Sequence, residues 1–256
     1  MSNFNNCRSV IRIGGHDNAE FLQGLITNSL PVSEKDLVYS ALLTPQGKYL
    51  YDFFLFKKGS DYFLDIKTNS TKELITRLAM YQLRAKVELN DTKLKVSRGL
   101  NATAKFVRHD PRCTALGWRH YSEEKLSEEN VDWELIRVMN CIPETGVELI
   151  QNKTFILEAG FERINGVDFN KGCFVGQEVT ARMKHKTTLR KGLARVIVKG
   201  SVRPGSTISV NGKPVGILYT QSNKMGIAYL NFDRAIGKME ADGVEIRNDP
   251  KWAFRP

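Results

Sequence analysis

The sequence predicts an α+β fold that is followed by a small all-β domain. In the first two-thirds of the 256 residues, strand and helix patterns follow one another without regular βαβα repeats. After Lys191 the helical periodicity disappears, and short strand patterns separated by glycine turns take its place. We therefore expect an α+β region over residues 1–190, with room for two subdomains, and a small C-terminal β-barrel over residues 191–256.

The N-terminal elements are a strand and a helix. Residues 9–13 (SVIRI) are β-branched and precede Gly14-Gly15, which is typical of a strand that ends in a turn. Asp17 stands three positions before Glu20, as in a capping box. An apolar face then recurs at helical spacing, so the sequence predicts a helix over 17–29 that ends before Pro31.

A hairpin and a second helix follow. The TPQG turn at 44–47 has proline and glycine where a type I turn prefers them, and Ser70 with Glu73 forms a second capping box. The expected elements of this region are strands at 37–43, 48–57 and 61–67 and a helix from about 70 to 81. Further on, the sequence favours short strands near 87–89, 94–96, 106–108 and 116–118, a solvated polar run over 122–130, and a short helix over 132–140.

The last quarter of the chain has only strand patterns. Asn211-Gly212 lies between two of them and is a strong hairpin signal. The expected strands are 193–198, 206–210, 214–220, 225–230 and 243–247.

Composition narrows the class of protein. Hydrophobic residues make up 41% and charged residues 26%, which is the mix of an ordinary globular protein. The formal net charge of +10 indicates either an anionic partner or simply a basic surface. No run of apolar residues is long enough to span a membrane, and neither a secretory nor a mitochondrial signal is visible. The four widely spaced cysteines suggest free thiols in a reducing cytoplasm, with no metal site and no disulfide framework.

The segment KGCFVGQEVTARMKHK at 171–186 carries the most chemical information. Gly172 and Gly176 bracket Cys173, and glycines allow tight backbone turns close to a ligand. A helix beginning near Gln177 would place the thiol close to a helix N-terminus and beside Lys171, and both features favour a thiolate of lowered pKa. The alternative is a small, inert, buried cysteine.

A basic run follows this segment. It contains no acidic residue, and it is either a solvated linker or an anion-binding rim for RNA phosphate or a carboxylate tail. Aromatic residues are scarce in it, which weakens the case for a single-stranded nucleic-acid platform. Its cations are Arg182, Lys184, Lys186, Arg190, Lys191 and Arg195.

KGCFVGQEVTAR resembles the signature of the YgfZ family, which consists of folate-binding, aminomethyltransferase-like proteins that assist iron–sulfur protein maturation. Four other segments resemble blocks of that family in the same order: FLQGLITN (21–28), ALLTPQGKYLYDF (41–53), YQLRAKVEL (81–89) and IPETGVEL (142–149). The resemblance covers most of residues 8–195. It implies the folate-binding fold of glycine-cleavage aminomethyltransferase, with tetrahydrofolate or a derivative as cofactor.

The resemblance also implies a set of site residues. Lys171 and Cys173 would be the catalytic pair, and Gly172, Gly176, Gln177, Glu178 and Arg182 would contribute to cofactor binding. Asp52 lies where the transferases carry an acidic pair, but Tyr51 precedes it, so one acid is missing. Glu158, in LEAG, resembles the glutamate that contacts the pterin. A carboxylate can accept two parallel hydrogen bonds from an amino-pyrimidine edge, and Arg84 with Lys86 or the basic run would suit the folate glutamate tail.

Three functions follow as hypotheses. The first is a tetrahydrofolate-binding accessory protein for iron–sulfur cluster assembly or repair, whose partners are assembly factors or client proteins. The second is a folate-dependent one-carbon transferase or a tRNA-modifying factor. The third is a basic RNA-binding module without folate, which would explain only the charge.

Overall fold

The computed structural model describes residues 7–101, 105–127, 129–186 and 188–252. The chain forms two compact units, and each unit draws on several stretches of sequence. The first unit contains Met1–Gln46, Leu50–Val131 and Glu162–Gln177, and the second contains Gly47–Tyr49, Asp132–Phe161 and Glu178–Pro256. The domain boundary near residue 190 stays a prediction.

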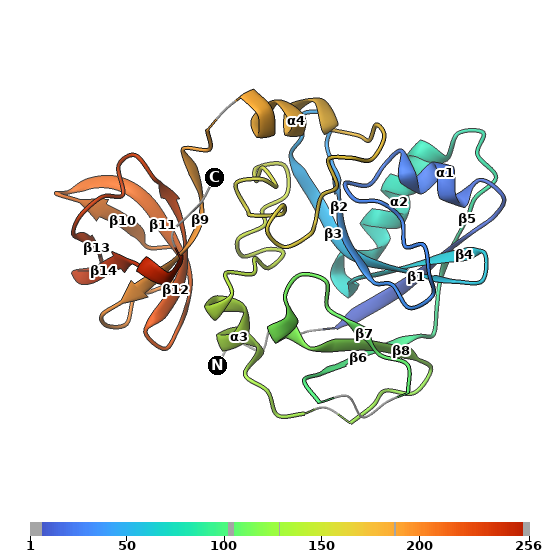
Figure 1. Cartoon of the computed structure of the whole chain (residues 1–256), viewed down its shortest axis with the longest axis horizontal. Coiled ribbons are helices and arrows are strands. Elements are labelled where there is room, and N and C mark those ends of the chain that lie inside the picture. Colours follow the sequence, from blue (N-terminus) through green and yellow to red (C-terminus); the bar gives the residue numbers. More distant parts are fainter. Residues whose placement is uncertain (1–6, 102–104, 128, 187, 253–256) are drawn as a thin grey trace. The chain divides into compact units, whose positions relative to one another are not determined.

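The first unit is built on a five-stranded sheet of order β2-β3-β4-β1-β5 (Figure 1). β1 runs antiparallel to both of its neighbours, so the N-terminal strand lies inside the sheet, between β4 and the edge strand β5. The strands are β1 (Arg8–Gly14), β2 (Val38–Leu43), β3 (Tyr49–Lys58), β4 (Asp61–Lys67) and β5 (Glu88–Asp91).

One face of this sheet packs against two helices, α1 (Asn18–Gln23) and α2 (Thr71–Gln82). Leu22 of α1 and Leu74 of α2 are fully buried there against the odd-numbered side chains of β3. Successive side chains of a strand point to opposite faces, so Tyr51 belongs to this apolar face and Asp52 to the other.

The other face carries aromatic rings and paired charges. A three-stranded sheet belongs to the same unit, with order β6-β8-β7, and Tyr121 of β8 stacks on Phe56 of β3 at 4.2 Å between ring centroids. The guanidinium groups of Arg8, Arg112 and Arg119 all lie over the Phe54 ring. The strands of this sheet are β6 (Lys95–Gly99), β7 (Arg108–His109) and β8 (Trp118–Ser122).

Two buried aspartates neutralise those arginines. Asp65 pairs with Arg8 and Arg119, and Asp110 pairs with Arg112 and Arg119. Burial alone would raise the pKa of Asp110, but Arg112 and Arg119 lower it to about 2. These three arginines therefore serve the interior of the fold, with two aspartates as their counter-ions.

Two local predictions in this unit were wrong. The helix expected over 17–29 ends at Gln23, because Thr27 leaves the helical path and its N–H donates to Ala41 O of β2. Neither predicted capping box forms: the Asp17 carboxylate accepts a hydrogen bond from Lys86 N, and Glu73 accepts one from the Tyr51 hydroxyl. Pairing with β2 ends the first helix early, and the two carboxylates of the expected caps bond to residues distant in the sequence instead.

The second unit contains two helices and a closed barrel. The barrel order is β10-β11-β12-β9-β14-β13, which confirms the predicted small C-terminal barrel (Figure 1, orange to red). Only β13 was missed, because three residues are too few to show alternation. The elements are α3 (Trp133–Met139), α4 (Gln177–Lys186), β9 (Lys191–Val198), β10 (Thr207–Val210), β11 (Lys213–Ser222), β12 (Met225–Asn231), β13 (Met239–Ala241) and β14 (Val244–Asn248).

A buried ion pair holds α3 to the barrel. Arg137 of α3 donates to both carboxylate oxygens of Glu148 at 3.1 Å and to the hydroxyl of Thr220 on β11 at 2.9 Å. Thr220 in turn donates to Glu148 at 2.5 Å. Asp132, the first residue of the predicted helix, is the N-cap of α3 and accepts a hydrogen bond from Leu135 N. None of the helices in the described ranges has the length and hydrophobicity that a membrane span requires.

Candidate functional site

The segment Asp168–Gln177, which we call the thiol loop, presents Cys173 to solvent. The thiol is exposed, whereas the next side chain, Phe174, is buried and Val175 packs against the core of the first unit. The alternative of an inert cysteine sealed in the core is therefore excluded. Cys173 precedes α4, as the sequence suggested, and its predicted thiolate character stays a prediction.

Lys171 anchors the thiol loop to the segment that follows α1. Its ammonium group donates to three main-chain carbonyls, those of Gln23 at 2.9 Å, Ile26 at 2.6 Å and Asn28 at 2.9 Å. An ammonium group has three donors, so these contacts use all of them. Burial lowers the pKa of Lys171 to about 8, and Asp168 opposes that shift. The catalytic role stays a prediction, and the geometry assigns Lys171 a positioning role.

Three further contacts tie the same two segments together. Asp168 accepts a hydrogen bond from the Ser29 hydroxyl at 2.6 Å, and its own N–H donates to Thr27 O. Val175 N donates to Gly24 O. Two sequence blocks that stand about 145 residues apart, FLQGLITN and KGCFVGQE, thus form one structural element.

The two glycines that bracket Cys173 have different roles. Gly176 has a φ of +83°, which an L side chain rarely adopts, so the turn into α4 requires glycine. Gly172 has no positive φ, and a Cβ there would meet no atom within 4 Å. A side chain could therefore be accommodated at position 172, and the space around this position, next to the exposed thiol, is open.

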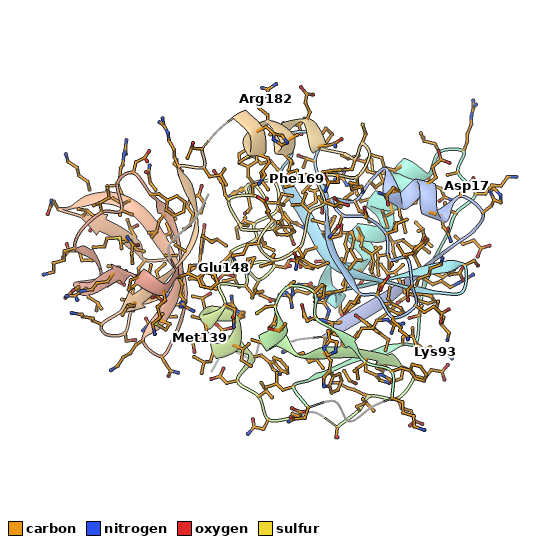
Figure 2. The ribbon with its side chains drawn as sticks, in the orientation of Figure 1. Asp17, Lys93, Met139, Glu148, Phe169 and Arg182 are labelled. Carbon is orange, nitrogen blue, oxygen red and sulfur yellow. The ribbon has the colours of Figure 1, made fainter. Side chains whose placement is uncertain are left out.

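Two of the predicted binding residues on α4, Glu178 and Arg182, have exposed side chains and lie on the solvent side of the helix. Arg182 extends from α4 into solvent (Figure 2) and pairs with the exposed Glu178 at 3.5 Å. On the same helix, Val179 and Met183 line a cavity of about 630 Å³. Gln177, half-buried, is the first helical residue and donates its N–H to Phe174 O.

Glu158 lies in this cavity, and the sequence had selected it as the pterin contact. The cavity lining is largely apolar, and its polar side chains are this carboxylate, the hydroxyl of Thr188 and two cations, Arg190 and Lys191. Glu158 also lines a second cavity of about 190 Å³, where Tyr229 of β12 donates a hydrogen bond to it at 2.9 Å. A few polar groups in a largely apolar hollow of this size are typical of small-molecule sites.

The charge state of Glu158 reflects competing effects. Burial raises its pKa above the ordinary carboxyl value, while the hydrogen bond from Tyr229 and the cations Lys48 and Lys191 lower it. The pKa of Tyr229 is raised as well, by burial and by the Glu158 carboxylate, so its hydroxyl keeps its proton and remains a donor. The backbone is fixed as well, since Glu158 O accepts a hydrogen bond from Leu193 N of β9 at 2.8 Å.

Asp52 and Arg84 lie elsewhere in the first unit. Asp52 accepts a hydrogen bond from the Tyr39 hydroxyl at 2.9 Å on the charged face of the sheet. Tyr51 points to the apolar face and is buried there, so an acid at that position would not face Asp52. Arg84 is exposed in the turn after α2.

The basic run divides in the structure. Arg195 is buried and pairs with Asp249 at 2.7 Å, so it serves the barrel and not a rim. Arg190 pairs with Asp233 at 3.7 Å, and both side chains are exposed. Lys184 and Lys191 are exposed, and the side chain of Lys186 lies outside the described part of the chain. Within that part, no three His, Cys, Asp or Glu side chains form a cluster suited to a metal ion.

Comparison with known proteins found a family model that matches the barrel and a solved structure that shares the fold of nearly the whole chain. Residues 190–255 match the family model described as the CAF17 C-terminal beta-barrel domain. The chain carries a CAF17-type barrel. The glycine cleavage system aminomethyltransferase T of Bartonella henselae has the same fold, with a TM-score of 0.75 over 94% of this chain and 82% of that one, at 11% sequence identity. The predicted aminomethyltransferase-like fold with its terminal barrel is confirmed.

Two curated relatives share a name. The human protein named iron-sulfur cluster assembly factor IBA57, mitochondrial, is 27% identical over 96% of this chain and 83% of its own length. The homologue of that factor in Mycosarcoma maydis is 27% identical over 72% of this chain, which spans only 54% of that protein. These names support the assembly hypothesis. The finer resemblance to the YgfZ family stays a prediction, and the tRNA-modification hypothesis gains no support from them.

The predicted cytoplasmic location was wrong. The relatives reported above are named as mitochondrial proteins, and that finding overturns an expectation based on cysteine usage and on the lack of a visible signal. Free cysteines are compatible with more than one reducing compartment, so they could not settle the location.

Sequence reasoning missed several residues that build the site. Asp168, Tyr229 and Phe155 were not selected, although they respectively fix the thiol loop, hold Glu158 and line its cavity. The i, i+4 pair Val179 and Met183 on the helix after the motif was the available signal for a cavity wall.

Proposed function

We propose that the chain is a tetrahydrofolate-binding accessory protein of iron–sulfur cluster assembly or repair. The observation that carries this proposal is the exposed Cys173, on a loop that part-buried hydrogen bonds from Lys171 hold in place, in a chain whose relatives are named cluster assembly factors. A thiol on such a loop is suited to act as one ligand of a cluster shared with a partner, or as a redox-sensitive group.

The cavity around Glu158 fits a reduced folate. Its apolar walls suit a flat heterocycle, the Glu158 carboxylate suits an amino-pyrimidine edge, and Arg190 with Lys191 suit the carboxylates of the glutamate tail. When bound, a reduced folate would supply a one-carbon carrier. The residues of this chain would bind it, orient it and exclude water from Glu158.

Folate binding is tested by changing Glu158. We expect Glu158→Gln to weaken binding of tetrahydrofolate by about tenfold or more, because charge-assisted hydrogen bonds contribute roughly 1.5–3 kcal/mol. Intrinsic tryptophan fluorescence measures the affinity, and Glu240→Gln, an exposed barrel acid outside the cavity, is the control. A thermal shift gives a second readout, since a ligand at 100 times its Kd stabilises a protein by about 2.7 kcal/mol. The absence of binding by every reduced folate would refute this part of the proposal.

The affinity should also depend on pH. Burial raises the pKa of Glu158, so its carboxylate becomes protonated at a higher pH than an exposed glutamate does. We therefore expect folate affinity to be full above that pKa and to decline as the pH falls through it. Glu158→Gln should abolish this decline, and an unchanged profile in the variant would assign the titration to another group.

The thiol is tested in cells that depend on this chain. We expect Cys173→Ser to lower the activity of cluster-containing enzymes severalfold, while Cys7→Ser, which alters another exposed cysteine, leaves it near wild type. Equal activity of the two variants would contradict a role for the thiol.

Transfer of a one-carbon unit from folate by the purified protein would favour the transferase alternative, which shares this fold.

A further inference from the structure

The end of α2 and the turn that follows it present an apolar strip to solvent. Leu83 is 91% exposed and Met80 is 64% exposed. Ala79 beside them is exposed as well, whereas Leu74 and Leu78 of the same helix are buried in the core of the first unit. Isolated exposed apolar side chains are common on protein surfaces, but residues three or four positions apart on a helix are neighbours. The three exposed residues therefore form one continuous strip.

Cations surround this strip. Residues 71–86 contain four cations and one acid, and the acid, Glu73, accepts a hydrogen bond from the Tyr51 hydroxyl. Within the described part of the chain, none of the four cations forms an ion pair with a carboxylate. We call the strip and these cations the α2 surface. Its cations are Lys72, Arg77, Arg84 and Lys86.

Leu83 adopts a backbone conformation that an L side chain rarely takes. Its φ is +43° and its ψ is −103°. The turn is held on both sides, because Gln82 Nε2 donates to Val87 O at 2.6 Å and the Asp17 carboxylate accepts from Lys86 N at 2.8 Å. Glycine would take this φ at a lower cost, and the exposed leucine gains little from burial in return. Strain of this kind is typical of residues that contact a ligand or a partner.

The combination of apolar strip and cations selects the kind of partner. Phosphates of a nucleic acid would neutralise Arg84 and Lys86 but would leave Met80 and Leu83 uncovered. A second copy of this chain would bring like charges together, which is unfavourable. A helix with an apolar side and carboxylates at its borders covers the strip and neutralises the cations at once.

We propose that the α2 surface docks an acidic amphipathic helix of a partner protein. The apolar side of that helix covers Met80 and Leu83, and its carboxylates pair with Arg84 and Lys86. This inference goes beyond the proposed function, because the α2 surface uses neither the thiol nor the Glu158 cavity. It gives the segment YQLRAKVEL (81–89) a role as a docking element.

The charge of the α2 surface is tested with two labelled synthetic helices on the purified full chain. One carries leucine on one side and glutamate at the borders, and in the other every glutamate is lysine. Fluorescence anisotropy should show that wild type binds the acidic helix about tenfold or more tightly, with a smaller advantage at higher ionic strength. Arg84→Glu should remove most of this advantage. Arg203→Glu, at an exposed barrel arginine, makes the same change in net charge and should retain it.

The apolar strip is tested by Leu83→Gly. Glycine relieves the positive φ, so the variant should unfold at a Tm no lower than that of wild type. The Kd for the acidic helix should nevertheless rise about tenfold, because burial of the leucine side chain is lost. Ile236→Gly, at a 69% exposed barrel isoleucine, is the matched control and should leave that Kd unchanged.

Four outcomes would overturn the proposal. The first is equal affinity of wild type for the two helices, or binding of neither, and the second is unchanged binding by Leu83→Gly. The third is tighter binding of a single-stranded RNA, weakened by Arg84→Glu but not by Leu83→Gly, which would assign the surface to nucleic acid. The fourth is a dimer in sedimentation that Leu83→Gly dissociates, which would assign it to a second copy. The tests of Cys173 and Glu158 stand apart from all four.

Discussion

Replacing Lys171 with methionine is expected to free the thiol loop and to destabilise the first unit by about 2–4 kcal/mol. Hydrogen bonds from a charged donor contribute roughly 1.5–3 kcal/mol each, and hydration of the released carbonyls offsets part of that loss. The variant removes all three contacts of the ammonium group with Gln23 O, Ile26 O and Asn28 O. Urea unfolding measures the loss of stability. Limited proteolysis between residues 165 and 177 measures the loosened loop.

The conservative variant separates positioning from charge. Lys171→Arg keeps the charge, but a planar guanidinium cannot direct donors at three converging carbonyls as an ammonium group does. We expect it to behave like Lys171→Met in proteolysis and in the cellular assay. Full rescue by arginine would show that only a positive charge is needed near Cys173, and would favour the catalytic role that the motif suggested.

Arg137→Met is expected to have the largest effect on the stability of the second unit. Glu148 has a fully buried side chain, and without Arg137 its charge would have no counter-ion there. Breaking a buried ion pair from one side typically costs about 3–5 kcal/mol, and at roughly 3 °C per kcal/mol this lowers the Tm by about 10 °C. Chemical and thermal unfolding of the full chain measure both quantities.

The sign of the pH dependence checks this mechanism. Burial raises the pKa of Glu148 even with Arg137 present, and removal of the guanidinium raises it further. The folded variant then binds a proton more readily than its unfolded chain, so its stability falls as the pH rises through the interval between the two pKa values. The deficit relative to wild type should shrink in mild acid. The double variant Arg137→Met with Glu148→Gln should recover part of the lost stability at neutral pH. If the stability deficit of Arg137→Met were independent of pH, lost packing alone would explain it.

Much of the fold could be predicted because it is encoded locally. Asn211, with a φ of +49°, and Gly212, with a φ of +74°, take the left-handed conformations that their residue types tolerate, so the hairpin and the barrel strands around them followed from sequence. The thiol loop was recognisable for a similar reason, since Gly176 marks an obligatory positive φ ahead of α4. Elements of this kind depend on residues that are adjacent in the chain.

The candidate site was only partly predictable. Glu158 was selected by resemblance, but its partner Tyr229 stands 71 residues away and carries no local mark. The helix expected over 17–29 was too long for the same reason, because pairing with β2 and the ammonium group of Lys171 satisfy backbone groups that the local pattern assigned to the helix.

The sequence by itself determined the class of the fold, the C-terminal barrel and the bracketed cysteine, because backbone preference and hydrophobic alternation act over a few neighbouring residues. Only the tertiary structure decided that Lys171 clamps carbonyls, that Tyr51 and Asp52 serve opposite faces, and that Glu158 lies in an apolar hollow. Those outcomes depend on which buried polar groups find partners across the fold. Burial makes an unpaired group costly, and a pattern along the chain does not specify the distant residue that pairs with it.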